Sequence, residues 1–133
     1  MMSILQQEVE VILARHFAEC LAIPVFIVDP EGNLLFYNEP AELILGQRFE
    51  ETGAMPAEEW GTVFTPADDE GSPLSLDQLP LMVALSKKRP SHRYMLIQGL
   101  NGTPRRIGVT AFPIIGQAER FLGAIALFWE ENL

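Results

Sequence analysis

The chain is 133 residues long, 48% of its residues are hydrophobic, and its formal net charge at neutral pH is −9. This length corresponds to one domain, and the apolar content excludes a disordered chain, which lacks the surface needed to offset the entropy of ordering. The negative charge argues against binding to nucleic acid or to anionic membrane surfaces, because both require basic patches on the protein.

The sequence contains no segment typical of a membrane or secreted protein. Its longest apolar runs, 21–28 and 121–129, are shorter than the roughly 20 residues that span a bilayer. No basic n-region of a signal peptide precedes the early apolar residues. The single cysteine, Cys20, has no partner for an internal disulfide. We therefore predict a cytoplasmic protein with no membrane partner.

The charge is distributed unevenly along the chain. Residues 1–80 contain 2 basic and 15 acidic side chains, whereas residues 81–133 contain 7 basic and 3 acidic ones. The second part of the chain is therefore positive although the whole is negative. This asymmetry either reflects an ordinary solvated surface or provides a polar face that attracts an acidic partner or ligand.

The first predicted element is a helix over 3–21, with Ser3 as its N-cap. Apolar residues recur there at three- and four-residue steps and form one stripe: Leu5, Val9, Ile12, Leu13 and Phe17. Ile4, Val11 and Leu21 add apolar surface outside this stripe. Because a surface helix needs only one buried stripe, we expect this helix to contact both its own domain and a second chain.

Two short strands follow, over 25–28 and 34–37, where nearly every residue is β-branched, aromatic or leucine. The residues between them, 29–33, are typical of a turn. Gly32 and Asn33 both tolerate the positive φ that a tight hairpin requires. The pattern predicts a β-hairpin.

A short helix is predicted over 39–45, with Gly46 closing its C-terminus. The segment 47–75 is rich in glycine, proline and acidic residues, which predicts short helical turns and loops. Trp60 and Phe64 are the expected apolar anchors of this segment.

The last helix is predicted over 77–87, ahead of Pro90. Three strands then complete the chain, over 91–98, 105–114 and 120–129. Asn101 and Gly102 form the turn between the first two of them. Runs of strands separated by a helical block predict an α+β fold with an antiparallel sheet.

The opening of this pattern resembles that of PAS domains. A strand ends in Asp29, the chain turns through Gly32, and a second strand ends in Asn38 ahead of a helix that carries Ala41. Further along, the segment 71–90 resembles the long PAS helix and its lead-in. Asn101-Gly102, 112–114 and 123–130 resemble the final hairpin and last strand, so the resemblance extends over about residues 22–131.

The resemblance implies a five-stranded antiparallel sheet, short helices over one face and a pocket between them. It divides the chain into an N-terminal flanking helix, 1–21, and a PAS domain, 22–133. The flanking helix would lie on the outer face of the sheet or form a dimer contact.

Alternation along the last strand places its residues on two faces. If the family orientation holds, Ala124, Ala126 and Phe128 face the pocket. The other face, which would pack under the N-terminal helix, carries Ile125, Leu127 and Trp129. The two inward alanines either leave space for a bound molecule or admit larger neighbouring side chains.

The expected ligand-binding residues are mostly apolar, as is typical of ligand pockets. Those that could line the pocket are Phe26, Val28, Leu45, Phe64, Met82, Leu85, Phe112, Ala124, Ala126 and Phe128. Possible polar contacts are Asn38, Tyr94 and Thr110. For each apolar residue the alternative is plain core packing.

A dimer interface is expected at Leu5, Val9, Ile12, Leu13, Phe17, Ile125, Leu127 and Trp129.

The cofactor types known for PAS domains leave specific marks, and two of them are missing. No Asn-Cys-Arg segment precedes the last predicted helix, since the only cysteine is Cys20, which argues against a covalently bound flavin. The segment 77–88 contains no histidine, and His92 lies beyond Pro90, which argues against haem. A non-covalent flavin, a fatty acid or another apolar metabolite stays open.

No catalytic or metal-binding motif is found. His16 and Cys20 share a helix face, but two ligands are too few for a tight metal site. The acidic residues 68–70 lack the spacing of a calcium loop.

We therefore predict a non-catalytic sensory or signalling domain that binds a small apolar ligand or a protein partner, as a homodimer. The alternative is a ligand-free dimerisation module with a filled core. The effector that receives the signal from this domain would be a kinase, cyclase or transcription factor. It would lie either on a separate chain or in another part of a longer protein.

Overall fold

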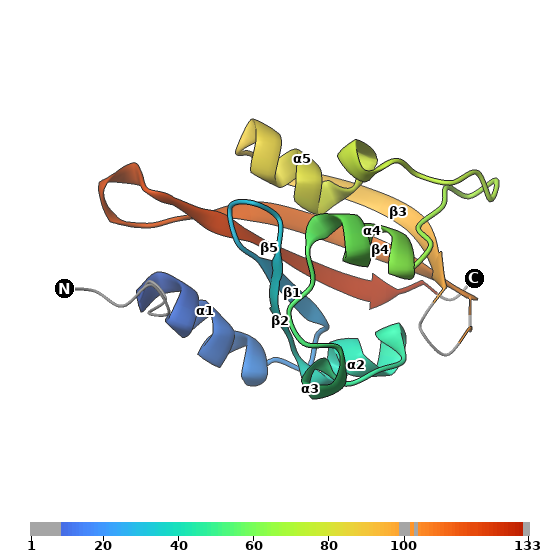
Figure 1. Ribbon diagram of the computed structural model, residues 1–133, viewed down its shortest axis with the longest axis horizontal. Helices are drawn as coiled ribbons and strands as arrows, with labels where there is room; N and C mark the ends of the chain where they lie inside the picture. The colour runs from blue at the N-terminus through green and yellow to red at the C-terminus, as the bar shows by residue number, and fades with distance from the viewer. Residues whose placement is uncertain (1–8, 99–101, 103, 132–133) are drawn as a thin grey trace.

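The computed structural model describes residues 9–98, 102 and 104–131. Its five strands form one antiparallel sheet with the order β2-β1-β5-β4-β3 (Figure 1). The strands are β1 (Val25–Val28), β2 (Leu34–Tyr37), β3 (Ser91–Gln98), β4 (Pro104–Ile115) and β5 (Phe121–Glu130). The predicted α+β fold with a five-stranded antiparallel sheet is confirmed.

Helices lie on both sides of the sheet (Figure 1). They are α1 (Val9–Glu19), α2 (Glu39–Leu45), α3 (Phe49–Thr52), α4 (Ala57–Val63) and α5 (Pro80–Lys87), with 3-10 turns η1 (Leu76–Gln78) and η2 (Gln117–Glu119). The larger apolar core lies between the inner face of the sheet and α2, α4 and α5. A second, smaller cluster lies between the outer face and α1.

The β1–β2 hairpin depends on one glycine and one aspartate. Gly32 has φ +89°, a left-handed value that favours glycine. The Asp29 Oδ1 atom accepts hydrogen bonds from the backbone N–H groups of Glu31 (3.0 Å) and Asn33 (2.9 Å), which fixes the turn. Asn33 was also expected to suit a positive φ, but among the described residues of this turn only Gly32 adopts one.

Asn38 connects four parts of the chain from a position that is only 2% exposed. Its Oδ1 atom accepts hydrogen bonds from the backbone N–H groups of Val25 (2.9 Å) and Ala41 (3.2 Å), so it caps α2 and holds β1. Its Nδ2 atom donates to the backbone carbonyls of Ala18 and Ile23, both at 2.9 Å. The end of α1, the linker, β1 and α2 are therefore joined through one buried amide.

Two predicted helices differ from the observed ones. The helix expected over 77–87 begins at Pro80, after a separate 3-10 turn, because Leu79 is extended (φ −75°, ψ 138°), as a residue before proline tends to be. α1 ends at Glu19, and the part of the predicted helix that includes Ser3 and Leu5 lies outside the described residues.

The expected strand boundaries agree to within a residue or so. β4 begins at Pro104 and β5 at Phe121, and the loop between them contains η2. Gly102 has φ +84°, as the predicted turn requires, while its partner Asn101 lies outside the described residues.

The apolar stripe predicted on α1 faces away from the sheet. Val9, Leu13 and Phe17 are 65%, 60% and 63% exposed, whereas Val11 and Ala18 are buried. The helix therefore rests on its smaller apolar side, and its larger one is open to a further contact.

Replacing Asn38 with alanine should lower the free energy of unfolding by about 3 kcal/mol, because it leaves buried backbone groups of β1 and α1 without partners. Denaturant unfolding followed by circular dichroism measures the change. As a control, Asn33→Ala removes one half-buried hydrogen bond to Asp29 (3.1 Å) and should cost less than about 1 kcal/mol. Equal losses for the two variants would contradict the role assigned to Asn38.

Candidate ligand-binding cavity

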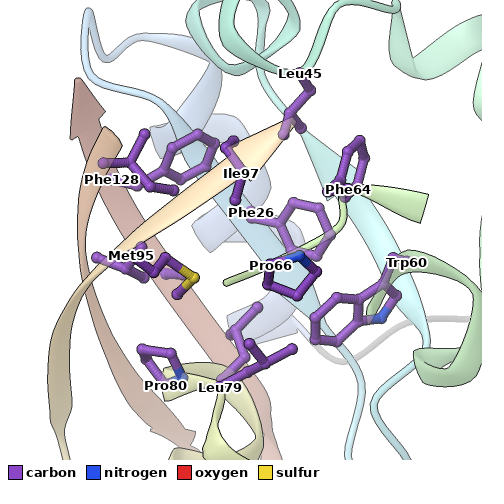
Figure 2. A pocket seen from close by; sticks show the side chains of 14 residues that line it. Phe26, Leu45, Trp60, Phe64, Pro66, Leu79, Pro80, Met95, Ile97 and Phe128 are labelled. Atoms are coloured by element: carbon purple, nitrogen blue, oxygen red, sulfur yellow. The ribbon is translucent and has the colours of Figure 1, made fainter. Parts of the chain in front are cut away.

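An apolar cavity of about 80 Å³ lies between the inner face of the sheet and the segments that cover it (Figure 2). Its wall is made by side chains of β1, β3, β4, β5, α2, α4 and α5 and of the segments before α5 and after α4. They are Phe26, Leu45, Trp60, Phe64, Pro66, Leu79, Pro80, Leu81, Met95, Ile97, Ile107, Val109, Ala126 and Phe128.

The strand register brings the sheet side of the wall together. Ala126 of β5 lies opposite Phe26 of β1, and Phe128 lies opposite Val109 of β4. Met95 of β3 is paired with Ile107 of β4. Because alternate residues of a strand point to the same face, these side chains converge on one side of the sheet.

Trp60 and Phe26 form the aromatic part of the wall. Their rings meet edge to face, with centroids 5.3 Å apart. The Trp60 Nε1–H group donates to the Gly32 carbonyl at 2.7 Å, so it anchors α4 to the β1–β2 turn. Since this N–H is already used, the lining side chains leave no hydrogen-bonding group free for a ligand. The cavity can therefore select a molecule by shape and apolar contact alone.

The structure brings five of the expected ligand-binding residues to the cavity wall: Phe26, Leu45, Phe64, Ala126 and Phe128. Four others are on the same side of the sheet but away from the wall: Val28, Met82, Leu85 and Ala124. Met82 and Leu85, for example, lie near the Gly32 turn.

The residues expected as polar contacts, and Phe112 with them, do not line this cavity. All polar atoms of Asn38 are bonded within the protein. Tyr94, Thr110 and Phe112 alternate with the inward-facing Met95 and with the other inward residues of β4, so they lie on the outer face of the sheet. Both faces of β4 carry apolar residues, and periodicity alone therefore did not show which face is inner.

Several wall residues had not been expected there. They come from β3, β4 and the turn before α5: Met95, Ile97, Ile107, Val109, Leu79, Pro80 and Leu81, together with Trp60 and Pro66. The alternation of Met95 with Ile97, and of Ile107 with Val109, was the available signal for the strand residues.

On the outer face, Ile125 is buried in the cluster under α1, and Leu127 is partly buried against that cluster. Ile125 is therefore unavailable for the expected dimer interface. Trp129 does not pack under α1 but stacks on His92, with ring centroids 5.9 Å apart. Its indole covers Gly108, where an added Cβ atom would come within 2.6 Å of the ring.

Within the described ranges, no three His, Cys, Asp or Glu side chains come together as a metal site. The only cysteine, Cys20, is exposed just after α1 and does not line the cavity. No helix of the described part of the chain has the length and apolar character needed to cross a membrane.

A scan against protein-family sequence models gives no match, and a comparison with curated protein sequences gives none either. Solved structures, in contrast, resemble the chain over most of its length. The PAS domain of Bordetella pertussis BvgS has 15% identity and a TM-score of 0.69, covering 95% of this chain and 89% of that one.

A LOV protein and a blue-light photoreceptor are also similar in structure. The Rhodobacter sphaeroides LOV protein has 15% identity and a TM-score of 0.72, covering 94% of this chain and 69% of its own. The light-state dimer of the fungal blue-light photoreceptor Vivid has 8% identity and a TM-score of 0.66, covering 98% of this chain and 99% of its own. The chain therefore has the PAS fold, and the resemblance seen in the sequence is confirmed at this level.

Ala126→Leu should fill the cavity and change the free energy of unfolding by less than about 1 kcal/mol, because the added carbon atoms enter existing space. Ala124→Leu is the matched control: Ala124 lies two residues earlier on the same face, is fully buried and does not line the cavity. Overpacking there should lower the free energy of unfolding by about 2 kcal/mol. Thermal and denaturant unfolding compare the two variants, and the reverse order of stabilities would contradict the cavity assignment.

Proposed function

We propose that the chain is a non-catalytic sensory or signalling domain whose cavity binds a small apolar molecule. The observation that carries this proposal is the cavity itself, which lies between helices and sheet and is walled by apolar side chains. The PAS fold supports the sensory role, since the solved structures of this fold named above include a blue-light photoreceptor.

The chemistry of the wall favours one of the ligand types that the sequence left open. A flavin presents polar ring edges that need hydrogen-bonding partners, and the lining side chains offer none. An engineered apolar cavity of about 150 Å³ binds benzene. A cavity of about 80 Å³ therefore suits a molecule of a few carbon atoms or the end of an acyl chain.

Native mass spectrometry of the purified protein tests this proposal, because a non-covalent ligand appears as an added mass that is lost on denaturation. Octanoic acid serves as a defined probe, with binding followed through Trp60 fluorescence in a Trp129→Phe background. Saturable binding is expected, and Ala126→Leu should weaken it at least about tenfold by occupying the site. If neither an adduct nor probe binding is found, the ligand-free dimerisation module becomes the better proposal.

The exposed stripe of α1 favours a second role, the formation of a homodimer. Val9, Leu13 and Phe17 are spaced four residues apart on one side of the helix and are largely exposed. An apolar stripe of this kind is typical of a protein-protein contact. Vivid, which has the same fold, is a dimer in its light state. Dimerisation and ligand binding are compatible, because the stripe and the cavity are on opposite faces of the sheet.

Leu13→Glu should raise the dissociation constant of such a dimer by about tenfold or more, since it places a charge at the centre of the stripe. Analytical ultracentrifugation over a concentration series measures the change. Ile115→Glu is the control, because Ile115 is also an exposed apolar residue but lies at the end of β4. If the unaltered chain, Leu13→Glu and Ile115→Glu all have the same mass in solution, this would count against a dimer through α1.

The signal would pass from this domain to an effector of the kinase, cyclase or transcription-factor type, on a separate or a continuous chain. A cytoplasmic location stays a prediction from the sequence.

A further inference from the structure

A groove separate from the cavity lies between the C-terminal half of α1, α2 and the segment 46–53 that includes α3. It encloses about 1230 Å³ and shares no lining residue with the apolar cavity. In Figure 1 the C-terminal end of α1 lies near α2 and α3, along the lower side of the molecule. A ligand in the apolar cavity therefore does not occupy the groove.

The walls of the groove are acidic. They carry two arginines, Arg15 and Arg48, and five glutamates: Glu19, Glu39, Glu42, Glu50 and Glu51. Arg15 lies 3.8 Å from Glu19, and Arg48 lies 3.1 Å from Glu50. The other three glutamates form no salt bridge within the described residues, so the groove keeps a negative charge.

The floor of the groove is aromatic and already contacts a cation. Phe36 and Phe49 meet edge to face, with ring centroids 5.5 Å apart. The Arg15 guanidinium lies 4.4 Å from the centre of the Phe36 ring and 5.9 Å from that of Phe49. The protein's own helix therefore shows that these rings accept a guanidinium group. On the rim, Leu43 of α2 is 74% exposed and offers an apolar contact.

These features together restrict the chemistry of an occupant. The groove is larger than the roughly 300–1,000 Å³ of typical small-molecule pockets. A phosphate-rich partner would be repelled by the glutamates. A metal ion is not matched, because in the described parts of the chain no three metal-ligating side chains converge. A peptide segment that carries both positive charges and apolar side chains fits the size, the charge and the apolar rim.

We propose that this groove binds a basic, amphipathic segment of a partner protein. Arginine or lysine side chains of the segment pair with Glu39, Glu42 and Glu51. Glu42 and Glu51 each also accept a hydrogen bond from a backbone N–H group, of Phe49 (3.0 Å) and Arg48 (3.3 Å). An apolar side chain of the segment contacts Leu43. The segment would reach α1 and α2 at the end where Asn38 joins them, so its binding bears directly on the position of α1.

The test uses the full chain and a fluorescein-labelled peptide, Arg-Leu-Arg-Lys-Leu-Leu-Arg with blocked ends, in a fluorescence anisotropy titration at low salt. Glu39→Gln combined with Glu51→Gln removes one charge from α2 and one from α3, at two groove glutamates that form no salt bridge among the described residues. This double variant should weaken binding about fivefold, and raising the ionic strength should do the same. The matched control is Glu31→Gln combined with Glu70→Gln, which changes the net charge equally at exposed positions that do not line the groove. It should bind the peptide as the unaltered chain does.

Two further peptides separate the parts of the proposal. A peptide with serine in place of each leucine should bind several-fold more weakly, and Leu43→Ser should reduce this difference. Equal binding of the leucine and serine peptides, or equal losses in the groove and control variants, would overturn the proposal. It would also be overturned if the chain bound no peptide but associated with itself in a salt-dependent way that Glu39→Gln with Glu51→Gln abolished. In that case a second copy, through its own basic residues 87–89, would be the occupant.

Discussion

The buried amide of Asn38 is the interaction on which the arrangement of this small domain depends. This side chain caps α2 and accepts a hydrogen bond from the first strand. It also donates one to the carbonyl of Ala18 near the end of α1, and its atoms are shielded from water. An apolar residue could fill the same volume but could not satisfy the backbone groups around it. The outer helix, α2 and the first strand thus share one point of attachment. The cavity is lined by Phe26 of β1 and Leu45 of α2 among others, and the groove by residues of α1 and α2, so both include elements that this point joins.

Much of the fold could be predicted from the sequence because its signals are local. The strands over 25–28 and 34–37 are bounded by a turn whose geometry Gly32 alone adopts, and Gly46 closes α2 as expected. The start of α5 was missed by three residues because Pro80 acts on the residue before it rather than on its own position. These are properties of short segments and need no knowledge of the tertiary structure.

The candidate site was harder to predict, since it depends on which face of each element points inward. In β4 both sets of alternating residues are largely apolar, so Thr110 and Phe112 appeared as suitable for a pocket as Ile107 and Val109. The α1 helix poses the same difficulty, because it packs on its smaller side and leaves its large stripe exposed. Asn38, a possible ligand contact from the sequence, instead has backbone partners for its whole buried amide, and these partners come from segments that only the tertiary structure brings together.

The geometry of β5 indicates how the proposed functions can be coupled. Ala126 lines the cavity, and its neighbour Ile125 is buried beneath α1 on the opposite face, so the strand touches both the ligand site and the helix that carries the exposed stripe. The cavity wall is apolar, so a ligand can act on the strand only through packing, and packed interiors transmit small displacements because they contain little free space. α1 also contributes Arg15 to the acidic groove, where it rests on Phe36. A shift of α1 would thus alter the dimer stripe and the groove together, which makes this helix the element through which a change in the core reaches two separate surfaces.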